Sequence, residues 1–77
     1  MFEVLPLIMM PEGVEGKVVE IRAGKGLLRR LTEMGFTENS VVKILSTNRG
    51  SLIVTINNCK YALGKGMAMK IMVKRDL

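Results

Sequence analysis

Two Gly-Lys-Gly triplets, at residues 24–26 and 64–66, come closest to a pattern that could do chemistry. Glycines expose backbone N–H groups and lysine adds positive charge, so such a triplet could hold a phosphate or another anion. Neither triplet completes a phosphate-binding loop, because no third glycine stands at the required spacing and no Lys-Ser or Lys-Thr pair follows the second. We interpret both as structural turns. The first also opens a helix, where weak anion binding stays open.

Side chains for metal binding or acid–base catalysis are scarce. The chain has no histidine and one cysteine, Cys59. This excludes a Cys/His zinc site and a Cys-His nucleophile within one chain, and the carboxylates show no acid–base pair. Five methionines could offer thioether ligands, but core packing is the favoured interpretation: Met9, Met10, Met67, Met69 and Met72. We predict no enzymatic activity, no metal, no cofactor, and a buried or half-buried Cys59.

A charged cluster on one predicted helix is the remaining candidate. Arg29 and Arg30 are adjacent, and Glu33 follows Arg29 by one helical turn, where the two can pair. A solvated helix face is the simpler interpretation, but an arginine pair beside apolar anchors is typical of contact surfaces. The hypothetical partner-contact residues are Lys25, Arg29, Arg30, Glu33 and Phe36.

Charge is unevenly distributed along the 77 residues. Residues 1–38 hold five basic and six acidic side chains (net −1), whereas residues 39–77 hold seven basic ones and one acidic one (net +6). The basic half could face nucleic acid, a membrane surface or an acidic partner. Three aromatic residues are few for base stacking. A lone cysteine fits a reducing cytoplasm, and the apolar first ten residues are too short to span a membrane. We expect a cytoplasmic protein without membrane insertion.

Helical periodicity is clearest over about residues 25–34. Leu27, Leu28, Leu31 and Met34 define one apolar face, and Gly35 follows at the position where a helix commonly ends in a left-handed conformation. The pattern therefore predicts a helix that buries these four side chains.

Short strand patterns surround the predicted helix. We predict an edge strand or extended arm over residues 5–10, strands over 16–23, 41–47, 52–56, 59–63 and 71–73, and a frayed tail over 74–77. In the 16–23 strand, Val19, Ile21 and Ala23 are expected to face the core and Val18 the solvent. Asn39, Asn57 and Asn58 are expected at positive-φ turn positions. The result is one mainly β domain, residues 1–77, with about five strands in a small barrel.

Several short motifs follow one another in a defined order: Pro6-Leu7, Pro11-Glu12-Gly13 and residues 16–21 at the start, residues 30–36 in the centre, and Ala62-Leu63, Ala68, Ile71 and Val73 at the end. Their order and spacing resemble those of the FeoA family. One departure is Glu38-Asn39 where the family usually has Pro-Gly. The resemblance implies an SH3-like barrel.

The resemblance also implies function by contact. Proteins of this kind accompany the membrane ferrous iron transporter FeoB and are thought to act on its cytoplasmic GTP-binding portion, and the family pattern defines no catalytic or metal residues. Transition-metal binding is associated with the family as a whole. Two alternatives stay open: a basic nucleic-acid-binding module, and a stand-alone form of the barrel found at the C-terminus of iron-dependent repressors resembling DtxR. Exposed sheet edges would also permit a weak homodimer.

Overall fold

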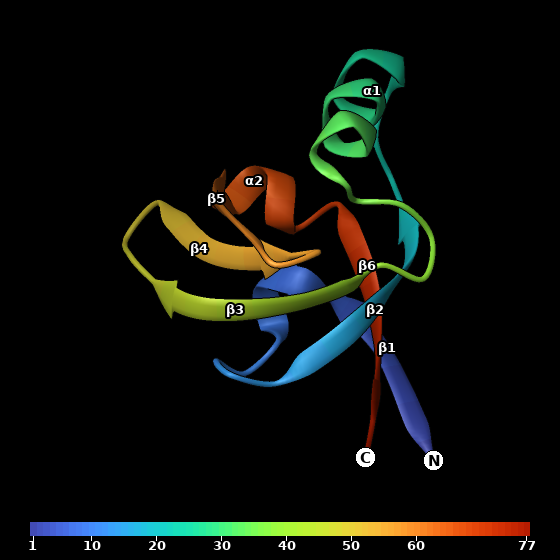
Figure 1. Cartoon of the computed structure of the whole chain (residues 1–77), viewed down its shortest axis with the longest axis vertical. Helices are drawn as coiled ribbons and strands as arrows, with labels where there is room; N and C mark the ends of the chain where they lie inside the picture. Colours follow the sequence, from blue (N-terminus) through green and yellow to red (C-terminus); the bar gives the residue numbers. More distant parts are fainter.

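The computed structural model describes residues 1–77. Its elements, in chain order, are β1 (Phe2–Pro6), the 3-10 turn η1 (Leu7–Met9), β2 (Glu15–Ile21), α1 (Lys25–Met34), β3 (Val41–Thr47), β4 (Ser51–Ile56), β5 (Cys59–Gly64), α2 (Lys65–Ala68) and β6 (Ile71–Asp76). The six strands form one antiparallel sheet in the order β1-β6-β2-β3-β4-β5 (Figure 1). The mainly β fold predicted from the sequence is confirmed, with one strand more than expected.

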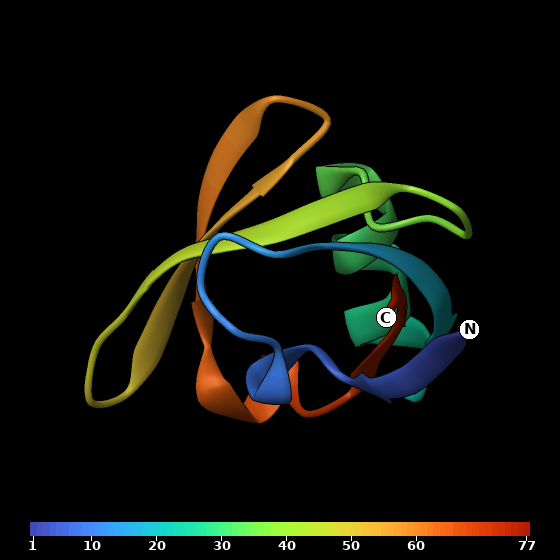
Figure 2. The same cartoon turned by 90° about the horizontal axis from the view of Figure 1, so that it is seen from below.

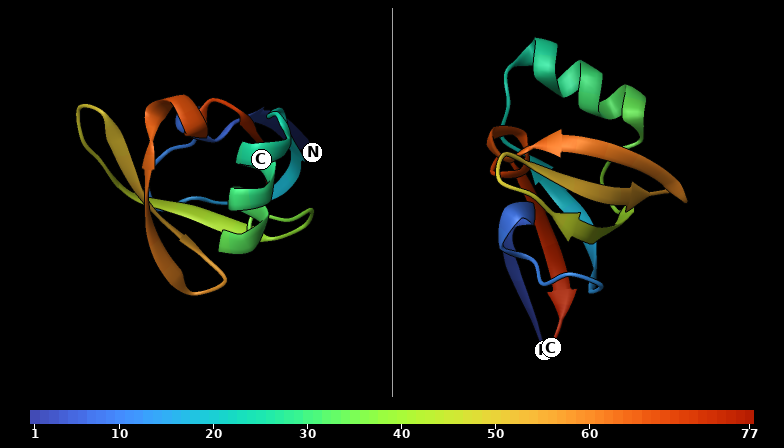
Figure 3. Two further views of the ribbon diagram at one scale, coloured as in Figure 1. Left: turned by 90° about the horizontal axis from the view of Figure 1, so that it is seen from above. Right: turned by 90° about the vertical axis from the view of Figure 1, so that its left-hand side faces the viewer.

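The sheet curls into an open barrel. Viewed from below in Figure 2, the strands surround the interior, and η1 and α2 lie side by side at its lower margin. The edge strands β1 and β5 are not hydrogen-bonded to each other. The helix α1 lies across one end of the barrel and the two chain termini lie at the other (Figure 3). The two ends of the molecule therefore present different surfaces.

A single aliphatic core fills the barrel. In β4, Leu52, Val54 and Ile56 are fully buried, while the alternate residues are half-buried. Val42 and Ile44 of β3 face the same interior. This alternation has the period of two that is typical of strands, because successive side chains of a strand point to opposite faces of a sheet.

The turns are built by asparagine where the sequence predicts it. Asn57 and Asn58 have φ angles of 51° and 65°, and Asn39 has a φ of 72°. Two consecutive positive φ angles close the β4–β5 hairpin with a twist that suits its strands. Asparagine tolerates this conformation better than other side chains.

The predicted facing of β2 is wrong at Val18. Val18 is 1% exposed and pairs with Val73, whereas the next paired residue, Glu20, lies opposite Met72. Val19 is the extra residue of a β-bulge in β2, with no partner of its own in β6. Because one residue is inserted, side chains before the bulge and after it follow opposite in–out alternations. Val18 and Ile21 therefore both lie on the core side, although they are three residues apart.

The ends of the chain are also more ordered than predicted. Residues 74–76 continue β6 instead of fraying, and β1 begins at Phe2, which pairs with Asp76. On the inner face of this pair, Arg75 Nε donates to Glu3 Oε1 at 2.7 Å. The predicted edge strand exists, but it spans Phe2–Pro6 and not residues 5–10. It ends early because the chain turns at η1 immediately after Pro6.

The helix α1 has the predicted bounds and a glycine-dependent end. Gly35 has a φ of +106°, its N–H donates to the carbonyl of Thr32 at 3.0 Å, and the N–H of Phe36 donates to the carbonyl of Leu31 at 2.9 Å. This pair of bonds is the Schellman motif, which brings the residue after the glycine onto the last helical turn. Leu31 and Phe36 are both fully buried.

Replacing Gly35 by alanine tests this helix end. A Cβ on Gly35 would lie 2.9 Å from Asn57 Nδ2, and the φ of +106° is strained for any L side chain. We expect Gly35→Ala to lower the free energy of unfolding by about 1–3 kcal/mol, measured by urea unfolding. Gly26→Ala is the matched control, because a Cβ there meets nothing within 4 Å. That variant should be neutral or gain up to about 1 kcal/mol, since alanine favours helix over glycine. Equal stability of the two variants would contradict the assignment.

Candidate contact surface

The helix α1 is attached to the barrel by one face. Leu31 is fully buried, and Leu27 and Met34 are half-buried against the core. Leu27, Leu31 and Met34 lie at spacings of four and three residues, which places them on the same side of a helix. The charged residues between them consequently point away from the barrel.

The four charged residues of α1 form what we call the α1 charged face: Lys25, Arg29, Arg30 and Glu33, all exposed. Arg29 Nε lies 3.9 Å from Glu33 Oε1, with 83% and 71% of the two side chains exposed. An ion pair this open to water adds little stability. Lys25 and Arg30 make no ion pair. Three positive charges and one negative charge give the face a net charge of +2, which no ion pair with another part of the fold neutralises.

Phe36 does not belong to this surface. Its position directly after the helix predicts a place beside the charged residues, but its side chain is fully buried. The Schellman motif at Gly35 turns the chain back, so Phe36 packs into the core instead of extending the helix face. We therefore define the α1 charged face without Phe36.

A groove that the sequence pattern does not indicate runs beside α1. It measures about 300 Å³ and lies between the helix and β2, with Leu28, Val19 and Ile21 among its apolar lining residues. Leu28 is 39% exposed, whereas the helical pattern predicts it to be buried. Adjacent residues point about 100° apart around a helix, so Leu27 and Leu28 cannot both face the core centre. The polar Thr32, one turn after Leu28, marks this side as open to solvent.

The lip of the groove is acidic. Glu20 of β2 and Glu38 of the loop after α1 are exposed and line it. Glu20 is paired with Arg22 (Oε2 to Nε 3.2 Å), so Glu38 is the unpaired carboxylate. The α1 charged face therefore stands next to a groove with apolar walls and carboxylates at its edge. A partner could be recognised by charges of both signs and by apolar contact, which is the usual make-up of a protein–protein interface.

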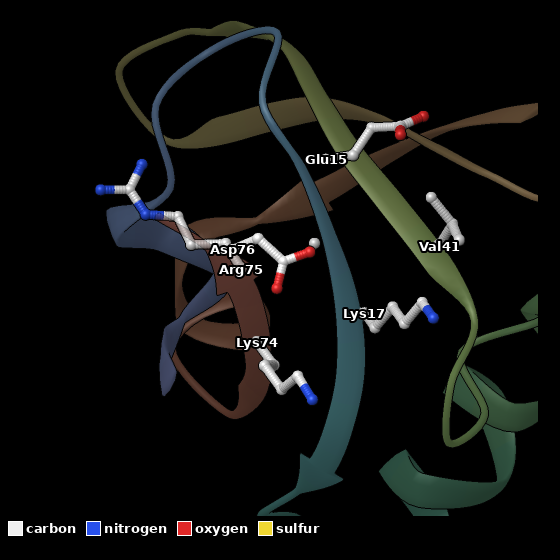
Figure 4. Close-up of a pocket in the computed structure, with 7 residues that line it drawn as sticks. Glu15, Lys17, Val41, Lys74, Arg75 and Asp76 are labelled. Carbon is white, nitrogen blue, oxygen red and sulfur yellow. The ribbon is translucent and has the colours of Figure 1, made fainter. Parts of the chain in front are cut away.

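A second hollow lies at the other end of the sheet, where β2 and β6 separate (Figure 4). It measures about 210 Å³, and Lys17 and Lys74, which are paired across the two strands, line it together with Glu15 and Asp76. Arg75 also lines the hollow, but its guanidinium is engaged with Glu3. The two remaining lysines are balanced by two carboxylates, so the hollow has no excess charge to favour an anion.

The other candidate residues are dispersed. Cys59 is exposed at the start of β5, not buried as predicted, because it follows directly on the two-residue turn. Of the aromatic residues, Phe36 is in the core, Tyr61 is half-buried against it, and Phe2 lies at the sheet edge with Lys74 over its ring. They form no stacking platform for nucleic acid. No group of three or more cysteine, aspartate or glutamate side chains is gathered where it could hold a metal ion.

The chain is thus a small open barrel of six strands with a charged helix face beside a groove. Neither of its helices is long and apolar enough to cross a membrane. The FeoA domain family matches residues 5–75, and the chain belongs to this family. It is accordingly an accessory protein of ferrous iron transport and not an enzyme.

Individual relatives agree with this assignment. A protein of Methanocaldococcus jannaschii, provisionally named Fe(2+) transport protein A, is 39% identical over 69 residues, covering 90% of this chain and 84% of the relative. The crystal structure of an iron uptake regulatory protein (FeoA) is 33% identical, with a TM-score of 0.87 over 97% of this chain and all of that one. FeoA of Stenotrophomonas maltophilia, described as a prokaryotic SH3 domain protein and crystallised with zinc, has a TM-score of 0.77 at 23% identity, covering 87% and 86%. The fold is SH3-like.

The two faces of α1 should respond oppositely to truncation. Leu31→Ala removes a fully buried side chain and should cost about 2–5 kcal/mol of unfolding free energy. Arg30→Ala removes an exposed, unpaired side chain of the same helix turn and should change stability by less than about 0.5 kcal/mol. Thermal unfolding followed by circular dichroism measures both. A large loss of stability in Arg30→Ala would show that the charged face supports the fold and is not a free surface.

Proposed function

We propose that this chain acts in ferrous iron uptake by binding the cytoplasmic GTP-binding region of a FeoB-type membrane transporter. Membership of the FeoA domain family supports the assignment to iron transport. Because the chain gathers no metal-ligand cluster, we propose regulation by protein–protein contact and not transfer of iron by this chain. The contact takes place in the cytoplasm.

The observation that carries the proposal is the α1 charged face. Its charges are exposed, contribute little to stability, and lie on a helix whose opposite face is anchored in the core. A rigid helix that projects charges from the end of a barrel can bind a partner without reorganising. The adjoining groove would receive an apolar side chain of the partner between Leu28 and Val19.

The electrostatics of the surface make the proposal specific. The net +2 of the α1 charged face would meet acidic side chains of the transporter, while the unpaired Glu38 would repel acids from the groove and so fix the orientation. Exposed charges act within a Debye length of about 8 Å at physiological salt. The association should therefore weaken as salt is raised, mainly through a slower association rate.

Charge reversal on α1 tests the contact. We expect the double variant Arg29→Glu/Arg30→Glu to weaken binding to the isolated GTP-binding region of the transporter by about tenfold or more, measured by biolayer interferometry at physiological salt. Both residues are exposed and outside the core, so the variant should melt close to the wild-type temperature.

A matched control separates a specific surface from total charge. Lys17→Glu/Arg49→Glu makes the same change of −4 in net charge at exposed positions on β2 and in the β3–β4 turn, away from α1. This control should retain binding within about threefold, the scale of a rim charge. Equal losses in the two double variants would reject the α1 charged face, and no binding by the wild type would reject this partner.

A further inference from the structure

The outer edge of β1 carries free backbone hydrogen-bonding groups. The carbonyl of Met1 accepts from the N–H of Leu77 at 2.9 Å, and β1 and β6 continue in register from Phe2 opposite Asp76 to Pro6 opposite Met72. In an antiparallel pair, alternate residues bond to the partner strand. Since Met1 bonds to the β6 side, so do Glu3 and Leu5. The N–H and carbonyl groups of Phe2 and Val4 therefore point away from the sheet.

This edge has few of the features that prevent strands from pairing, and its one proline, Pro6, stands at its last position. It has no lysine and no bulge, and its one charged residue, Glu3, is held on the inner face by Arg75. The other edge strand, β5, is different. Its two-residue turn makes Ile56 and Cys59 a bonded pair, so the free N–H groups of β5 are those of Lys60, Ala62 and Gly64. A lysine on an edge strand discourages pairing with another strand.

The outer side chains of β1 are also unusually apolar for a surface. Phe2 and Val4 are 55% and 48% exposed. Lys74 lies with its Nζ 4.5 Å from the centre of the Phe2 ring, which holds that ring on the outer face of the sheet. Free hydrogen-bonding groups and exposed apolar side chains thus coincide on two residues.

We propose that β1 pairs with β1 of a second copy of this chain, in antiparallel orientation about a two-fold axis at Val4. In this register each Val4 exchanges two backbone hydrogen bonds with Val4 of the second copy, and each Phe2 N–H donates to the carbonyl of Pro6 of the second copy. Pro6 has no N–H to donate, and because it lies at the end of the paired segment, only a terminal hydrogen bond is lost. The two six-stranded sheets become continuous.

Side-chain chemistry favours a second copy as the occupant. In this register the outer face sets Val4 against Val4 and Phe2 against Pro6, and the inner face sets Glu3 against Leu5, so no like charges lie directly opposite each other. One five-residue edge buries less than the roughly 1,200 Å² of standard interfaces. The dimer should therefore be weak, with a dissociation constant between about 10 µM and 1 mM.

Sedimentation velocity across the range from about 10 µM to 1 mM tests this pairing directly. The sedimentation coefficient should rise with concentration from that of the 8.5 kDa monomer toward that of a dimer. A monomer at every concentration would overturn the proposal. The transporter is absent from this experiment, so its outcome is independent of the function proposed above.

Proline variants locate the contact. Val4→Pro removes an N–H that points to the free edge and makes no bond to β6, and it should abolish concentration-dependent sedimentation. Ala62→Pro makes the equivalent change on the free edge of β5 and should leave the dimer intact. Persistence of the dimer in Val4→Pro, or its loss in Ala62→Pro alone, would place the interface elsewhere.

A charge-exchange experiment covers the case in which a proline variant fails to fold. Val4→Lys and Val4→Glu should each be monomeric, because like charges would oppose each other across the two-fold axis. Mixing the two in equal amounts should restore a dimer, since lysine then faces glutamate. If the mixture sediments as monomer at concentrations where the wild type dimerises, Val4 does not lie at the two-fold axis and the register is wrong.

Discussion

The left-handed turn at Gly35 is the constraint on which the functional end of the molecule depends. With a φ of +106°, it ends α1 and reverses the chain so that Phe36 packs into the core beside the barrel strands. Leu31 anchors the same helical turn from the other side. The rotation of the helix about its axis is thereby set. This one backbone conformation therefore determines which charged side chains of α1 project outward. Helix geometry sets the direction of every other side chain once the positions of two are known.

Regular local patterns could be predicted from the sequence. The alternation in β3 and β4 and the asparagine turns each depend on neighbouring residues, whose influence is visible in sequence order. The bounds of α1 were predictable for the same reason, since its apolar spacing and Gly35 mark both the face and the end. The charged residues of α1 could be identified as exposed because they lie outside the apolar face of the helix pattern.

Features that depend on distant residues could not be predicted in this way. The bulge at Val19 arises where β2 pairs with β6, some fifty residues later in the chain, so the burial of Val18 has no local signal. Order at residues 74–76 likewise depends on β1 at the opposite end of the sequence. The groove beside α1 requires Leu28 to face β2, which depends on the rotation that Leu31 and Phe36 impose. Sequence periodicity identified the helix, but only tertiary packing shows which leucine is left exposed.

The separation of the two surfaces bears on how they could be used together. The α1 charged face and the β1 edge lie at opposite ends of the barrel, as the positions of α1 and of the termini in Figure 1 show. Pairing through β1 would leave both helix faces free and directed outward from the two-fold axis. Such a dimer would bind one partner with two sites more tightly than a monomer does, because the second contact becomes intramolecular. A weak edge contact is suited to this role, since it forms only where the local concentration of the protein is high.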